Sequence, residues 1–166
     1  MDMLRFSSYV FVLVLMGLCT ISAQKNTSEK FLNAHNKERA LVGVPLLGWN
    51  NKVAAQASLF ARYQRDHDHC EMKHSGSTKY GENLFWGQGG PLTPTQGVQN
   101  WVDERKFYDY NNNSCQPDHQ CGVYTQLVWK NSTELGCALV TCDNKDTTLI
   151  ICYYSPPGNV IGEKPY

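Results

Sequence analysis

Apolar residues recur with a helical period in three segments of the first two thirds of the chain. The segment 28–41 begins with a capping serine and places Phe31, His35 and Arg39 near one face. The segment 50–65 follows Asn50, a good N-cap, and is rich in alanine. Together with the segment 93–106, these patterns predict three helices.

The period changes in the last third. The segments 124–129, 135–142 and 148–154 are rich in β-branched and aromatic residues, which favour strands. Residues 143–146 predict a turn between the last two strands, and 81–86 reads as a short helical or irregular segment. Helices first and antiparallel strands later predict an α+β domain built in layers.

The amino terminus has the features of a secretory signal. Arg5 precedes an apolar run over 9–18, and Ala23 offers a small residue before Gln24. We therefore expect a signal peptide over 1–23 and a single domain over 24–166. Beyond residue 23 no stretch is long and apolar enough to predict a transmembrane segment.

The cysteine count supports export and suggests a disulfide pattern. Removal of Cys19 with the signal leaves six of the seven cysteines, an even number suited to an oxidising compartment. The predicted hairpin places Cys137 opposite Cys152, within reach of a disulfide. Cys142 is five residues from Cys137 and points to the other face of the sheet, so we pair it with Cys70. The pair Cys115–Cys121 then closes a short loop.

Charge and modification motifs narrow the function classes. The chain has 15 basic and 15 acidic residues and no basic run, which argues against a nucleic-acid partner. No phosphate loop or dinucleotide motif is present, and we predict no cofactor. Three Asn-x-Ser/Thr sequons, at Asn26, Asn112 and Asn131, are candidate glycosylation sites.

Three polar residues lie in apolar or glycine-punctuated stretches and are candidates for chemistry: His74, Glu82 and Glu104. An imidazole and carboxylates beside an apolar surface can hold a divalent metal weakly, or act as acid and base. The alternative is a hydrogen-bonded polar cluster that locks the helices to the sheet. We assign no catalytic residue.

Several motifs resemble one family over about Phe31 to Tyr166. They include CEMKHSGS, YGENLFW, CGVYTQLVWKNS and IICYYSPPGNVIGEKPY. These segments are similar to the CAP superfamily (cysteine-rich secretory proteins, antigen 5, pathogenesis-related 1), in its plant pathogenesis-related class 1 branch. The resemblance implies a three-layer α-β-α sandwich, secretion, sterol or lipid binding, and defence against fungi and oomycetes.

The resemblance also implies a central cavity with two histidines and two glutamates. His74, Glu82 and Glu104 match three of these positions, and Val123 stands at the second histidine. The valine side chain has no lone pair. Tight zinc binding therefore lacks one of its nitrogen ligands, and a hydrolase mechanism lacks one of its two histidines. His119, four residues away, could replace it only if its loop folds inward.

We therefore expect a monomeric binding protein and no enzyme. The alternatives are a hydrolase based on His74, Glu82 and Glu104, and a scaffold for a pathogen or host protein.

The carboxyl-terminal segment 156–166 matches a further family feature. In the plant branch such a segment is proposed to be released as a defence signalling peptide, here by cleavage between Ser155 and Pro156. The alternative is that this segment packs along the domain surface. No vacuolar extension follows Tyr166, so we expect the apoplast rather than the vacuole.

Overall fold

The computed structural model describes residues 25–142 and 146–166. The expected signal peptide and most of the predicted turn over 143–146 lie outside these residues. The described elements are, in chain order, a helix over 25–41, β1 (Gly48–Trp49), α2 (Asn51–His67), β2 (Gly81–Gln88), α3 (Pro94–Val102), the 3-10 helix η1 (Asp103–Phe107), β3 (Tyr108–Asp109), β4 (Ser114–Cys115), α4 (Gly122–Leu127), β5 (Glu134–Thr141) and β6 (Thr147–Ser155). None of the described helices combines the length and the apolar character needed to cross a membrane.

Four strands form the central sheet in the order β1-β5-β6-β2. The strands β5, β6 and β2 are antiparallel, and β1 joins the edge in parallel through Gly48 and Trp49 alone. Strands β3 and β4 form a separate short pair. The sheet is therefore antiparallel at its centre, with one short parallel edge strand.

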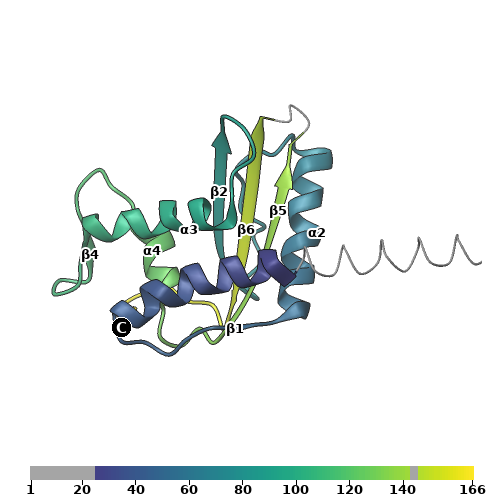
Figure 1. Cartoon of the computed structure of the whole chain (residues 1–166). Coiled ribbons are helices and arrows are strands. Elements are labelled where there is room, and N and C mark those ends of the chain that lie inside the picture. Colours follow the sequence, from purple (N-terminus) through teal and green to yellow (C-terminus); the bar gives the residue numbers. More distant parts are fainter. Residues whose placement is uncertain (1–24, 143–145) are drawn as a thin grey trace, which may run out of the picture.

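The alternation of side chains along β6 divides the core into two halves. Leu149, Ile151 and Tyr153 pack with residues of α2 on one face. On the other face Ile150, Cys152 and Tyr154 pack with residues of the N-terminal helix, α3 and α4. Figure 1 shows α2 on one side of the strands and α3 and α4 on the other. The predicted α-β-α sandwich is confirmed.

Local capping explains the helices that the sequence predicts. The side chain of Asn50 accepts hydrogen bonds from the N–H groups of Lys52 and Val53 and so starts α2. Thr93 and Gln96 form a capping box at the start of α3. The predicted helix over 93–106 is present, but its last turn is the 3-10 helix η1.

Two element predictions are wrong. The segment 81–86 belongs to β2, which pairs along its whole length with β6. The segment 124–129 is largely helix α4, so Val123 lies in a helical turn and not at the start of a strand. In both places contacts with distant parts of the chain override local propensity.

Three disulfides staple the fold. Cys70–Cys142 joins the loop after α2 to the end of β5, with Cα atoms 6.1 Å apart. Cys137 lies opposite Cys152 in the β5–β6 ladder and is bonded to it. Cys115–Cys121 closes the loop before α4. These are the three pairs predicted from the sequence, of which the hairpin register alone predicts Cys137–Cys152.

A buried arginine fixes the loop around α4. Arg39 is fully buried, and its guanidinium donates hydrogen bonds of 2.8–2.9 Å to the carbonyls of four residues, namely Pro45, Leu127, Trp129 and Ser132. Burial lowers the pKa of Arg39 to about 10. The five donors of a guanidinium suit this role because they point in fixed, diverging directions.

Candidate functional site

His74 and Glu82 form the first half of the predicted site. Nδ1 of His74 lies 2.5 Å from Oε1 of Glu82, and the backbone N–H of Ser75 donates to both oxygens of the same carboxylate. The side chain of His74 is 67% exposed, whereas that of Glu82 is 9% exposed. The loop before β2 therefore folds over Glu82 and leaves the imidazole at the surface.

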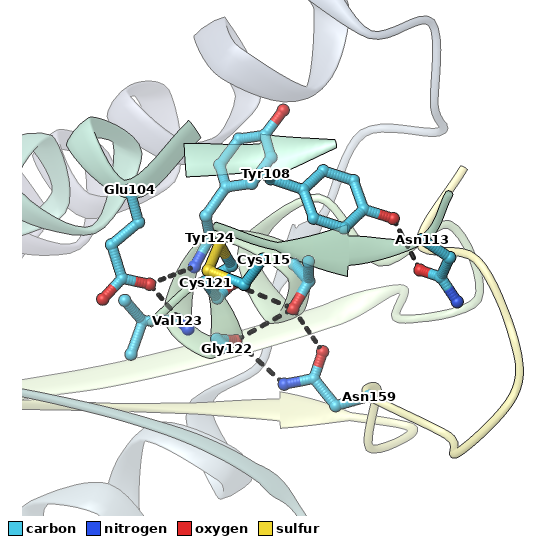
Figure 2. Close-up of a disulfide and its surroundings, with 10 residues drawn as sticks. Glu104, Tyr108, Asn113, Cys115, Cys121, Gly122, Val123, Tyr124 and Asn159 are labelled. Atoms are coloured by element: carbon cyan, nitrogen blue, oxygen red, sulfur yellow. Dashed lines mark hydrogen bonds between the residues drawn. A yellow bond between two sulfur atoms is a disulfide. The ribbon is translucent and has the colours of Figure 1, made fainter. Parts of the chain in front are cut away.

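Glu104 on η1 forms the second half and lies at the start of α4. Its Oε2 accepts hydrogen bonds from the backbone N–H groups of Val123, at 3.3 Å, and Tyr124, at 3.5 Å. Figure 2 shows this carboxylate at the first turn of α4, close to the Cys115–Cys121 disulfide. Burial raises the pKa of Glu104, and the two N–H groups act in the opposite direction. Glu104 thus satisfies donors that a helix start leaves unpaired.

Val123 connects this turn to the sheet. Its backbone carbonyl accepts a hydrogen bond of 2.8 Å from Nδ2 of Asn83 on β2. Its side chain packs against the core of the α3–α4 face. The position that resembles the family's second histidine therefore contributes apolar packing and two backbone hydrogen bonds.

A buried polar network continues from Asn83 and was missed at the sequence level. Nδ2 of Asn83 also donates to the hydroxyl of Tyr154, at 3.0 Å, and this hydroxyl lies 2.8 Å from Nε2 of His35. Nδ1 of His35 lies 2.7 Å from the carbonyl of Phe31. Because a carbonyl only accepts, Nδ1 carries the proton and Nε2 accepts the proton of Tyr154. The position of His35 on an apolar helix face was the available signal.

Burial governs the protonation of this network. His35 is fully buried, which lowers its pKa to about 4. Burial also raises the pKa of Tyr154. Both groups are therefore neutral at neutral pH, and the chain of hydrogen bonds ties the N-terminal helix through β6 and β2 to α4.

The structure thus divides the predicted residues into two pairs. His74 contacts Glu82, and Glu104 contacts Val123. Within 25–142 and 146–166, no group of three or more His, Cys, Asp and Glu side chains is placed to hold a metal ion. His119 stacks on Phe107, with ring centroids 3.6 Å apart, so its ring is already engaged. The residues described do not fit a zinc site.

Comparison with known proteins decides the family. The sequence pattern of the CAP family, described as the cysteine-rich secretory protein family, matches residues 32–154. The chain belongs to the CAP family. The match contains every element from β1 to β5 and nearly all of β6, so it covers both halves of the site.

Plant proteins are among the relatives of this CAP domain. The STS14 protein of Solanum tuberosum is 53% identical over 139 residues, which are 84% of this chain and 65% of that protein. The chain therefore spans just under two thirds of the potato protein's length. Pathogenesis-related protein 1C of Nicotiana tabacum is 43% identical over 98% of this chain and 96% of its own. These relatives support the plant pathogenesis-related class 1 branch.

Solved structures share the CAP fold. The crystal structure of MpPR-1i has a TM-score of 0.58 and 22% identity, over 84% of this chain and 92% of that one. The structure of NaASP2 with Zn²⁺ has a TM-score of 0.67 and 22% identity, over 84% of each chain. At this identity the likeness concerns the fold alone.

The carboxyl-terminal segment of this CAP protein packs along the domain. Its first half is held at α4, where the side-chain oxygen of Gln126 accepts the N–H of Gly158 and Asn159 bonds to Thr125 and Gly122. Its end is held by the N–H of Lys130, which donates to the carbonyl of Pro165 at 2.7 Å. In the intact chain this geometry agrees with the packed alternative.

Proposed function

We propose that this protein is an exported plant defence protein of the pathogenesis-related class 1 type, which acts by binding a sterol or another lipid. The names of the plant relatives support the defence role. The observation that favours a binding function over a catalytic one is the set of contacts that Glu104 makes. Its carboxylate holds the start of α4, and Val123 offers it no side-chain base.

The turn after the N-terminal helix supports a lipid ligand. Leu41 and Leu46 are 64% and 60% exposed, and Pro45 between them is also exposed. These two exposed leucines are the contact that we propose for a sterol ring system or a membrane lipid. Arg39, anchored beneath this turn by its bond to the carbonyl of Pro45, holds the turn in place.

A sterol-binding assay tests this proposal. Vesicles with and without sterol are mixed with the purified protein, and binding is measured by co-sedimentation. We expect binding that depends on sterol and that falls in the double variant Leu41→Ser/Leu46→Ser. Ile161→Ser is the matched control because Ile161 is fully exposed in the carboxyl-terminal segment. Equal binding to both kinds of vesicle would contradict a sterol ligand.

The hydrolase alternative is favoured by the His74–Glu82 contact, which resembles a base held by a carboxylate. The variant Glu82→Gln separates the two functions. Loss of a hydrolytic activity with unchanged stability would support catalysis, whereas loss of stability alone would support a structural role. We propose the structural role, because Glu82 also binds the backbone of Ser75.

The proposal includes export of a monomer to the apoplast, with removal of residues 1–23. Asn26, Asn112 and Asn131 are all exposed, so each sequon is accessible to glycosylation. Amino-terminal sequencing of the secreted protein tests the cleavage and is expected to begin at Gln24. An amino terminus that still includes Met1 would contradict it.

The proposal also includes release of the segment 156–166 as a signalling peptide. Pro156 and Pro157 are exposed, but Ser155 is half-buried at the end of β6. Cleavage therefore needs local opening of the last residue of β6. Mass spectrometry of extracellular fluid checks for the free peptide, and an intact carboxyl terminus during infection would argue against release.

A further inference from the structure

One edge of the central sheet is only partly covered. β1 pairs with Glu134 and Leu135 of β5, and the chain then turns into α2 at Asn51. In the described residues no strand pairs with positions 137–141 on the edge of β5 that β1 occupies. This edge of β5 is therefore not paired with a strand at five of its eight residues, positions 137–141.

The pairing of β5 with β6 shows which main-chain groups of β5 face this unpaired edge. The N–H of Cys142 donates to Thr147, so the even-numbered residues of β5 bond to β6. The odd-numbered residues turn their main-chain groups the other way, as Leu135 does when its carbonyl accepts the N–H of Asn50. By the same alternation the main-chain donors and acceptors of Cys137, Leu139 and Thr141 face the unpaired edge.

A groove of about 840 Å³ lies against this edge at positions 137–139. The edge of β5 contributes Cys137 and Leu139, and one wall is the outer face of α2, with the small side chains of Ala55 and Ser58. The start of the N-terminal helix, including Lys25, contributes the opposite wall. Figure 1 shows β5 beside α2, with the N-terminal helix starting close to both.

The charges of the groove have one sign. Lys25 and Arg62 line it, and both are cationic, whereas the other lining residues are uncharged. Glu29 approaches Lys25 at 4.0 Å, but both side chains are exposed, and such a pair contributes little. The groove therefore favours a ligand with negative charge.

We infer that this groove binds an extended acidic segment of a partner protein. This segment pairs with β5 as an added strand, on the same edge as β1. A strand supplies the hydrogen bonds that Leu139 and Thr141 can make at the edge, and acidic side chains meet Lys25 and Arg62. An acyl chain would cover the same main-chain groups without bonding to them, which is unfavourable. The small side chains of α2 leave room for the incoming backbone.

This inference is separate from sterol binding at Leu41 and Leu46. It rests on the proposed export in one respect, because removal of residues 1–23 leaves Lys25 next to the new amino terminus. Amino-terminal sequencing of the secreted protein therefore comes before the binding experiment. A failure of processing is thereby distinguished from a failure of the groove to bind.

Amide NMR on the secreted protein tests the inference. The probe is a short capped peptide of alternating valine and glutamate. We expect saturable shifts of the Leu139 and Thr141 amides. Methylation of the peptide nitrogens that face β5 should weaken binding about tenfold or more, because it removes the hydrogen bonds that these nitrogens donate to the edge. A peptide with lysine in place of glutamate should also bind more weakly.

Matched variants on α2 locate the site. Ser58→Trp fills the groove and should abolish binding, whereas Gln56→Trp adds the same ring at an exposed position outside the lining. Arg62→Glu should weaken binding of the acidic peptide. The control Lys52→Glu reverses a charge elsewhere on α2, outside the groove. Absence of saturable shifts would overturn the inference. So would equal binding of the methylated peptide, or shifts of these amides by oleate alone.

Discussion

At the scale of single residues, His35 gives the fold a defined response to acid. Burial lowers its pKa from about 6.5, the ordinary value for histidine, to about 4 in the folded chain. Between these values the unfolded chain binds more protons, so stability falls as the pH falls through this window. The full difference is about 3 kcal/mol at 1.36 kcal/mol per pH unit. We expect urea unfolding to show the loss between about pH 6.5 and about pH 4.

Two variants isolate this effect from other carboxyl and histidine groups. His35→Phe should lose stability overall but show a smaller dependence on pH in this window. His67→Gln, at an exposed position, should keep the parent's dependence. Burial raises the pKa of Glu104, which acts in the opposite direction because the folded chain then binds the extra proton. An unchanged pH dependence in His35→Phe would refute the role of His35.

Val123 is the residue at which the absence of a metal ligand can be tested. Figure 2 shows its side chain next to the carboxylate of Glu104. In the variant Val123→His an imidazole nitrogen would join this carboxylate, and we expect Zn²⁺ affinity measured by calorimetry to rise about tenfold or more. Val160→His is the control, because Val160 is exposed in the carboxyl-terminal segment. Equal affinity in parent and variant would show that Val123 does not limit metal binding.

At the scale of elements, the close approach of α2 to β5 depends on Gly136. A Cβ atom at this position would collide with the backbone of Val53 and Ala54, and backbone atoms cannot rotate away. We expect Gly136→Ala to destabilise the protein by about 3 kcal/mol in urea unfolding. Gly48→Ala, on the neighbouring strand β1, is the control because its Cβ would meet only one oxygen at 3.8 Å. A loss equal to that of the control would contradict this tight packing.

Some elements of the fold could be predicted from the sequence, and others could not. The Cys70–Cys142 pair joins residues 72 apart and follows from the alternation of side chains along β5. In contrast, α2, the hairpin register and the Cys137–Cys152 pair follow from neighbouring residues, because Asn50 caps α2 and β5 and β6 are adjacent in the chain. β2 and α4 do not, because their support comes from far along the chain. Gly81 lies against the side chain of Gln126, and Glu104 caps the backbone of α4. The sequence motifs identify the candidate residues, but their division into the pairs His74–Glu82 and Glu104–Val123 emerges only from the packing.

At the scale of the whole molecule, the disulfides connect the layers over very different lengths of chain. Cys70–Cys142 spans 72 residues, and Cys115–Cys121 spans six. In the chain-entropy view the longer loop stabilises by about 4 kcal/mol and the shorter by about 2 kcal/mol. Replacing both cysteines of each pair by alanine should therefore cost more for Cys70–Cys142, by about 2 kcal/mol in urea unfolding.

Position in the fold strengthens this expectation. Cys70 and Cys142 are both buried in the core between α2 and the sheet, so their replacement also removes packed sulfur atoms. Cys115–Cys121 instead shapes the loop before α4, where Glu104 holds the next turn independently. Loss of the shorter bridge should thus leave the sheet and the groove at β5 intact, with unchanged shifts of the Leu139 amide. A larger loss of stability from the shorter bridge would mean that α4, and not the α2 layer, limits the stability of the molecule.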